Sequence, residues 1–86
     1  MITCRIFTPE GTKEELMTEI VTFDAPHARR GIQPGHMPVV VSVEEGHLWT
    51  VADGVRSRHA IGEGVMYYRD GVATFLVSSY GEDRTE

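Results

Sequence analysis

Short apolar segments alternate with turn residues along the whole chain. These segments are rich in β-branched and aromatic residues, and turns recur about every 8 to 12 residues, a pattern that predicts strands rather than helices. We expect seven strands, at residues 2–7, 19–23, 39–43, 47–52, 55–61, 65–69 and 72–78. Several short strands joined by frequent turns are typical of an all-β sandwich or barrel.

Two aspartate–glycine pairs mark the tightest turns. Asp53-Gly54 and Asp70-Gly71 each lie between two apolar runs, where this dipeptide favours a two-residue hairpin. In the strand that follows the first turn, alternation directs Arg56 and Arg58 toward solvent and the intervening side chains toward a core. The sequence therefore predicts two antiparallel hairpins.

Helical potential is confined to residues 12–17. Thr12 and Glu15 have the spacing of a capping box, but the segment is too short for a lasting helix. We expect a single helical turn there. After a domain of residues 1–80, the polar residues 81–86 are expected to form a short, frayed tail.

Length and charge narrow the class of protein. The chain has 86 residues, enough for one domain, and 41% of them are hydrophobic, which argues against a disordered tail. Its net charge of −5 disfavours a free-standing nucleic-acid binder. The longest apolar run, at residues 38–41, is too short to span a membrane, and we expect no secretion signal. Cys4, the single cysteine, is expected to be a small buried residue.

Four histidines are the candidates for metal chemistry: His27, His36, His47 and His59. Their spacing matches no compact ligand pair, so we expect no metal site and no bound cofactor. No acid–base pair or nucleophile constellation is present either, which indicates a protein that is not an enzyme. The alternative function at this point is a small β-barrel module that binds a metabolite or a metal through these histidines.

The most informative segment is the loop of residues 31–38. Two prolines and two glycines within eight residues favour a stiff, irregular loop, and such loops on a scaffold often serve recognition. The loop leads into three consecutive valines, and in a strand Val40 points away from Val39 and Val41. Either a partner covers one of these apolar faces, or both are buried at a corner of the sandwich.

Gly31-Ile32-Gln33-Pro34-Gly35-His36-Met37-Pro38 resembles the G-I-x-P-G-H-x-P signature of the epsilon subunit of F-type ATP synthases (delta in mitochondria). Downstream, Gly62-Glu63-Gly64-Val65 and the segment at residues 70–76 are similar to the later strands of the same domain, and the likeness covers residues 1–80 in order. The resemblance implies a flattened β-sandwich of about ten short strands without substantial helix.

The resemblance also implies a function. It indicates a non-catalytic central-stalk subunit that binds gamma and the polar loops of the c-ring, and that couples proton-driven rotation to ATP synthesis. Such a subunit lies peripherally on the cytoplasmic face of the inner (plasma) membrane of a bacterium, in the F1 sector. The residues expected to contact these partners are Arg29, Arg30, Gly31, Ile32, Gln33, Pro34, Gly35, His36, Met37, Val39 and Val41.

Two departures from the family pattern qualify this expectation. Family members often carry an acidic residue shortly before the signature glycine, whereas Arg29 and Arg30 occupy that neighbourhood here, so the partner surface should differ in charge. The family's inhibitory C-terminal helical hairpin has no counterpart before Glu86. We therefore expect a subunit that couples rotation without inhibiting hydrolysis and without binding nucleotide.

Overall fold

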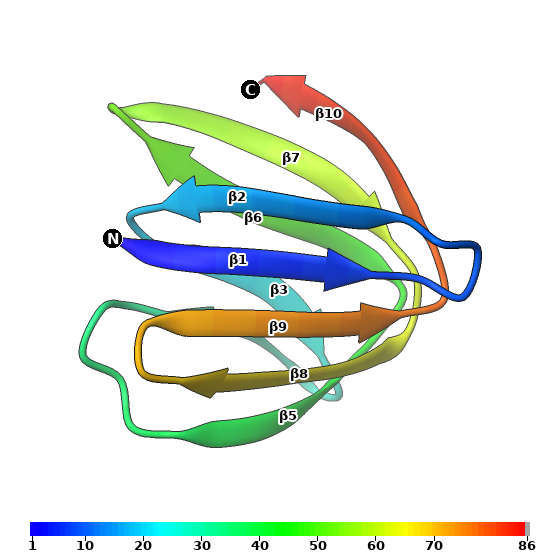
Figure 1. Ribbon diagram of the computed structural model, residues 1–86, viewed down its shortest axis with the longest axis horizontal. Coiled ribbons are helices and arrows are strands. Elements are labelled where there is room, and N and C mark those ends of the chain that lie inside the picture. The colour runs from blue at the N-terminus through cyan, green and yellow to red at the C-terminus, as the bar shows by residue number, and fades with distance from the viewer. Residues whose placement is uncertain (86) are drawn as a thin grey trace.

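Ten strands in two sheets make up the computed structural model, which describes residues 1–85, with the side chains of residues 1–81 (Figure 1). The prediction of an all-β sandwich is confirmed. In this described part of the chain, no helix has the length and apolar character that a membrane crossing requires. The strands are β1 (Ile2–Phe7), β2 (Lys13–Thr18), β3 (Val21–Ala25), β4 (Ala28–Ile32), β5 (Val39–Val43), β6 (Gly46–Ala52), β7 (Val55–Ile61), β8 (Gly64–Arg69), β9 (Val72–Val77) and β10 (Tyr80–Thr85).

The two sheets are five-stranded layers. Sheet A has the order β2-β1-β9-β8-β5 and sheet B the order β10-β7-β6-β3-β4. Neighbouring strands are antiparallel except for β1 and β9, which pair in parallel. The loop of residues 33–38 leaves the edge of sheet B at β4 and enters the edge of sheet A at β5. It therefore crosses from one layer to the other, at the left of Figure 1.

Both predicted hairpins are confirmed, and their turns have the expected backbone. Asp53 and Gly54 have φ values of 52° and 76°, and Asp70 and Gly71 have values of 50° and 81°. Positive φ at both central residues is the geometry of a type I′ turn, whose twist matches that of the flanking strands. Aspartate tolerates this region better than most residues, which explains why the dipeptide occurs at both turns.

Residues 12–17 do not form the expected helical turn. Residues 13–17 instead belong to β2, which pairs antiparallel with β1 from Ile2 opposite Thr18 to Phe7 opposite Lys13. Leu16 of β2 packs against the core. The helical prediction was wrong because pairing with the exposed edge of β1 outweighs a local capping signal.

The observed strands differ from the predicted ones in three further respects. The strand expected at residues 19–23 lies at Val21–Ala25, and β4 was not predicted at all. The tail expected to fray is instead strand β10 as far as Thr85, paired antiparallel with β7, while Glu86 lies outside the described residues. This strand was not predicted because its sequence is polar. Its pairing with β7 is made by backbone groups, which do not require apolar side chains.

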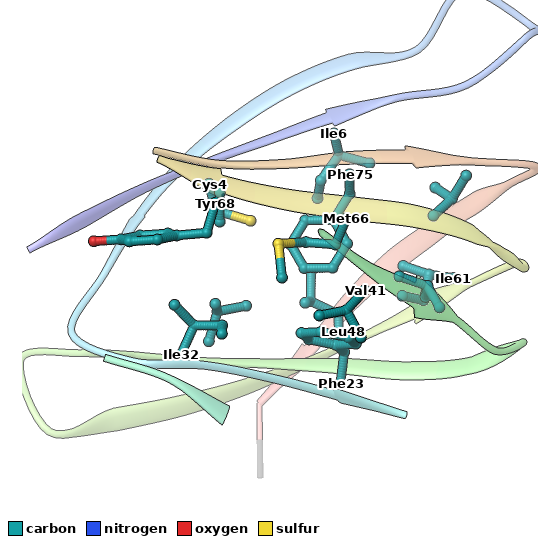
Figure 2. Close-up of a cluster of buried hydrophobic side chains, with 14 of the residues drawn as sticks. Cys4, Ile6, Phe23, Ile32, Val41, Leu48, Ile61, Met66, Tyr68 and Phe75 are labelled. Atoms are coloured by element: carbon teal, nitrogen blue, oxygen red, sulfur yellow. The ribbon is translucent and has the colours of Figure 1, made fainter. Parts of the chain in front are cut away.

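The core lies between the two inner faces (Figure 2). Phe23 of sheet B and Phe75 of sheet A meet edge to face at its centre, with ring centroids 5.3 Å apart. Cys4 is fully buried, as predicted, and burial raises the pKa of its thiol to about 12. Apolar packing between the two sheets thus fixes the positions of β4 and β5, the edge strands that the loop connects.

Candidate partner-binding surface

The loop of residues 31–38, which we call the signature loop, contains a tight turn at Gln33–His36. The backbone N–H of His36 donates a hydrogen bond to the carbonyl oxygen of Gln33 over 3.1 Å. Pro34 occupies the second position of this turn, and Gly35 has a φ of 87° at the third, as a type II turn requires. A Cβ on Gly35 would meet no atom within 4 Å, so the glycine is required by backbone conformation and not by space.

His36 holds the end of this turn. Its Nδ1 lies 2.6 Å from the carbonyl oxygen of Met37, and because a carbonyl only accepts, Nδ1 is the protonated nitrogen. The imidazole also meets the buried ring of Tyr68 edge to face, with centroids 5.9 Å apart. The loop is therefore pinned to sheet A, and Met37 is left 78% exposed beside it.

The β4 residues before the turn divide between two sides of the strand. Arg29 and Gly31 face outward from sheet B, whereas Arg30 shares its side with Ile32. Arg30 is exposed at the rim, while Ile32 is fully buried in the core. Ile32, one of the expected partner contacts, thus anchors the strand from inside and cannot itself meet a partner.

The three valines of β5 resolve the alternative that the sequence left open. Val40 is 71% exposed, so the apolar faces are not both buried at a corner of the sandwich. Val39 is half-buried against the core, and Val41 belongs to the core. Val41 was expected to contact a partner, but its burial removes it from the surface. The exposed valine is Val40, which the expected set did not contain.

Val40 lies on an apolar strip that crosses the outer face of sheet A. Val40 pairs with Tyr67 of β8, and Leu76 of β9 pairs with Val65 and with Phe7 of β1. Val40 is 71% exposed, Tyr67 45% and Leu76 45%, while Phe7 and Val65 are half-buried. We call these five residues the apolar strip. A signal for it exists in the sequence, because β8 and β9 contain consecutive apolar residues where antiparallel strands with one solvated face usually alternate.

The histidines do not assemble into a site. Among the described residues, no group of three or more histidine, cysteine, aspartate or glutamate side chains could hold a metal ion. His59 is buried between Thr50 and Tyr80, with Nε2 3.2 Å from the Thr50 hydroxyl and Nδ1 3.0 Å from the Tyr80 hydroxyl. An open hollow of about 430 Å³ is lined by Arg5, Phe7, Lys13, Glu14 and Glu15, without a histidine.

Comparison with known proteins agrees with this fold. The family model described as ATP synthase, delta/epsilon chain, beta-sandwich domain matches residues 1–82. The chain belongs to this family. No curated protein sequence matches the chain as a relative.

Solved structures share the fold of this delta/epsilon domain, and one of them illustrates the likeness. It is a chain in the cryo-electron microscopy structure of the central stalk and c-ring of the mitochondrial ATP synthase of Tetrahymena thermophila, with a TM-score of 0.72 and 14% sequence identity. The alignment covers 94% of our chain and 66% of that chain, so the delta/epsilon domain described here spans just under two thirds of that neighbour's length.

In this delta/epsilon domain the signature loop and the apolar strip are continuous in the chain. Met37 directly follows the turn at residues 33–36, and Val40 lies three residues after Met37 in β5. A rigid loop and an exposed apolar face therefore meet at one edge of sheet A, where a partner could contact both.

Proposed function

We propose that this delta/epsilon domain acts in a non-catalytic central-stalk subunit of an F-type ATP synthase. It binds the gamma subunit and the c-ring, and it transmits proton-driven rotation of the ring toward ATP synthesis. The observation that carries the proposal is the exposed apolar strip beside the pinned signature loop. Family membership over residues 1–82 supports it.

Gamma is the partner that we assign to the apolar strip. The strip exposes apolar side chains on three adjacent strands of sheet A, and contiguous exposed apolar surface on a small domain marks a contact with another protein. A torque-transmitting contact has to persist through many rotations, and apolar burial gives such an interface its stability.

The c-ring is the partner that we assign to the loop and to the arginines before it. Met37 projects from the pinned turn, and Arg29 and Arg30 flank the base of the loop. Gln33, Pro34, Gly35 and His36 form the turn of the loop, and Val39 begins β5 directly after the loop. Through these contacts the subunit would lie peripherally at the membrane as part of the F1 sector, on the cytoplasmic face if the enzyme is bacterial.

Substitution of Val40 tests the contact with gamma. Val40→Asp places a charge at the most exposed position of the strip, where it would be desolvated in the interface, so co-purification with co-expressed gamma should fall at least about tenfold. Val55→Asp is the matched control, because Val55 is 51% exposed at the β6–β7 turn, away from the strip. If both variants lose co-purified gamma equally, or if Val40→Asp retains gamma, then gamma is not the partner of the apolar strip.

Charge reversal tests the contact with the ring. The variant Arg30→Glu should assemble poorly into the complete synthase while its thermal midpoint stays close to that of the unsubstituted chain, since this side chain is exposed at the rim. The variant Arg29→Glu/Arg30→Glu should assemble poorly too, but it should also be less stable, because Arg29 pairs with Asp24 and stacks on Trp49. The measurement is the amount of subunit retained when the synthase is purified through its c-ring. Undiminished retention would count against the role of these arginines.

A further inference from the structure

The two sheets do not end together where the signature loop joins their edge strands, β4 and β5 (Figure 1). Ala28 and Arg30 lie opposite Ala25 and Phe23 of β3, on the side of β4 that faces the core. Ala25 and Phe23 are buried, whereas Ala28 and Arg30 are exposed. The cover that sheet A gives to sheet B therefore ends between β3 and this part of β4. We call the free edge of β5, together with Ala28 and Arg30, the edge step.

Two residues of β5 direct their backbone groups toward the open side of the sheet. The carbonyl of Glu63 accepts a hydrogen bond from the backbone N–H of the first residue after β9. Because this direction alternates along a strand, Met66 directs its backbone groups the opposite way, toward Val41 of β5. Val40 and Ser42 consequently present their N–H and C=O groups to the open side, and both residues are exposed.

The strand β5 also differs from the other edge strands in charge. The sequences of β2, β4 and β10 each contain two or more charged residues, and charge on an edge strand hinders pairing with another chain. The sequence of β5 is Val-Val-Val-Ser-Val, without a charge. Such β-branched residues pack well across neighbouring strands. The free edge of β5 is therefore suited to receive a further strand.

The position that such a strand would take lies over β4. The backbone N–H of Glu44, directly after β5, donates a hydrogen bond to the carbonyl of Asp24, which links this end of β5 to β3. A strand added to β5 would lie about 4.8 Å beyond it, the spacing by which β4 lies beyond β3. Every second side chain of the added strand would point toward Ala28 and Arg30.

Arg30 supplies the step with a charge that an added strand can match. Its side chain is exposed, and it makes no hydrogen bond or ion pair with any residue that the structure describes. Arg29, on the other face of β4, is instead paired with Asp24. A carboxylate on the side of the added strand that faces β4 would be the natural partner of the Arg30 guanidinium.

We propose that the edge step binds an extended segment of a partner protein, which joins β5 as a sixth strand of sheet A and places a carboxylate against Arg30. The rest of the segment is uncharged, because β5 has no charge to compensate one that is desolvated beside it. In strand addition, backbone hydrogen bonds give affinity and alternate side chains give specificity. The inference deepens the proposed function and rests on it only for the origin of the segment, a subunit of the same synthase.

The isolated chain can be titrated with a peptide of this chemistry. The probe is acetyl-TVDVTV-amide at low salt, in which the aspartate and the threonines share one face of an extended strand. The measurement is the chemical shift of the backbone amides of the chain. Val40 and Ser42 should shift in a saturable manner, whereas Met17 in β2, at the opposite edge of sheet A, should not.

Two comparisons separate the backbone contribution from the charge. Ser42→Pro removes the N–H that faces the open edge and should abolish the shifts, while Ser42→Ala keeps this N–H and should retain them. Arg30→Gln should weaken binding of the aspartate peptide at least about threefold and leave binding of acetyl-TVNVTV-amide unchanged. Because the second comparison needs no change in the strand itself, it holds even if Ser42→Pro folds poorly.

The outcomes that overturn the proposal are specific. It is wrong if Val40 and Ser42 show no saturable shift, or if folded Ser42→Pro binds the peptide as tightly as Ser42→Ala. Shifts confined to Tyr67 and Leu76 would place the peptide on the face of the apolar strip and overturn strand addition. Equal affinity of the aspartate and asparagine peptides for the unsubstituted chain would overturn the pairing of a carboxylate with Arg30.

Assembly with gamma and the c-ring is measured separately on the same variants. If the unsubstituted chain binds the aspartate peptide at Val40 and Ser42 but fails to assemble, the proposed function is refuted and the edge step remains a strand-binding site. If the unsubstituted chain and Ser42→Pro assemble equally well and the peptide does not bind, the inference alone is refuted.

Discussion

At the scale of single residues, neighbours in sequence serve different surfaces. Arg29 stacks on Trp49 at the outer face of sheet B, whereas Arg30 lies at the rim of the core on the other side of β4. The strand period of two residues causes this division. Single substitutions at the two arginines therefore report on two different contacts, and the double reversal reports on their sum.

Cys4 leads to a prediction about alkaline stability. Its pKa rises from 9.0 to about 12 on burial, so the thiolate forms first in the unfolded chain. The stabilisation from the neutral buried thiol is fully present below pH 9 and is lost as the pH rises toward 12, by up to about 1.4 kcal/mol per pH unit. Urea unfolding measured between about pH 8 and pH 10.5 should show a steeper decline for the unsubstituted chain than for Cys4→Ala.

Comparing how steeply the free energy of unfolding falls with pH in the two proteins isolates the contribution of the Cys4 thiol. Other groups that titrate at alkaline pH are common to both proteins, and the sulfur lost in Cys4→Ala lowers stability equally at every pH. Parallel declines in the two proteins would mean that Cys4 ionises as readily in the folded chain as in the unfolded one.

At the scale of elements, close backbone approach makes one glycine essential to sheet A. Gly64 begins β8 opposite Val77, and a Cβ on it would lie 2.7 Å from Val77 Cα and 2.9 Å from the carbonyl carbon of Leu76. These are backbone atoms of a central strand, which cannot move aside without shifting β9. This glycine lets the chain cross from sheet B into the β8–β9 hairpin that carries Tyr67 and Leu76.

We therefore predict that Gly64→Ala destabilises the domain by about 1–3 kcal/mol, the usual cost of overpacking. Gly31→Ala is the control, because the nearest atoms to its Cβ would be 3.8 Å away, and its free energy of unfolding should change by about 0.5 kcal/mol or less. Urea denaturation gives both values. The steric account is wrong if the two variants have the same stability.

At the scale of the whole molecule, the two outer faces differ in character. The outer face of sheet A has the apolar strip, and that of sheet B has arginines over a tryptophan. Each face lies on its own layer, with the core between them (Figure 2). The two faces of this small sandwich therefore present surfaces of different chemistry.

The exposed strip predicts that the isolated chain binds a hydrophobic dye. Anilinonaphthalene sulfonate should bind the folded chain, and Val40→Asp/Leu76→Glu should reduce its emission at least roughly threefold. Val55→Asp, which removes one exposed apolar side chain outside the strip, should change the emission much less than Val40→Asp alone does. The thermal midpoints should agree within about 4 °C, because the substituted side chains are exposed. Unchanged emission in the double variant would mean that the strip is not a continuous apolar surface.

The candidate surface could be predicted only in part. Turn chemistry placed the stiff loop at residues 31–38, and its Pro34-Gly35 turn is as tight as that composition indicates. The partner contacts themselves stay a prediction. Ile32 and Val41 proved to be core residues, and Tyr67 and Leu76 were not anticipated. The consecutive apolar residues of β8 and β9 indicate that both faces of these strands carry apolar side chains. Which of them stay exposed depends on the order of the strands in the folded sheet, which no local pattern specifies.

The sequence by itself determined the features that depend on a few adjacent residues. The two aspartate–glycine hairpins, the strands between them and the all-β class follow from turn conformation and from side-chain alternation, which act over short distances. The choice of a sandwich over a barrel came from the resemblance to the family. Tertiary structure alone decided the parallel pairing of β1 with β9, the strand conformation of residues 13–17 in β2, and the position of Arg29 and Arg56 over Trp49. These features join segments far apart in the chain, so they are set by backbone pairing and packing in the folded molecule, where non-local contacts outweigh local propensity.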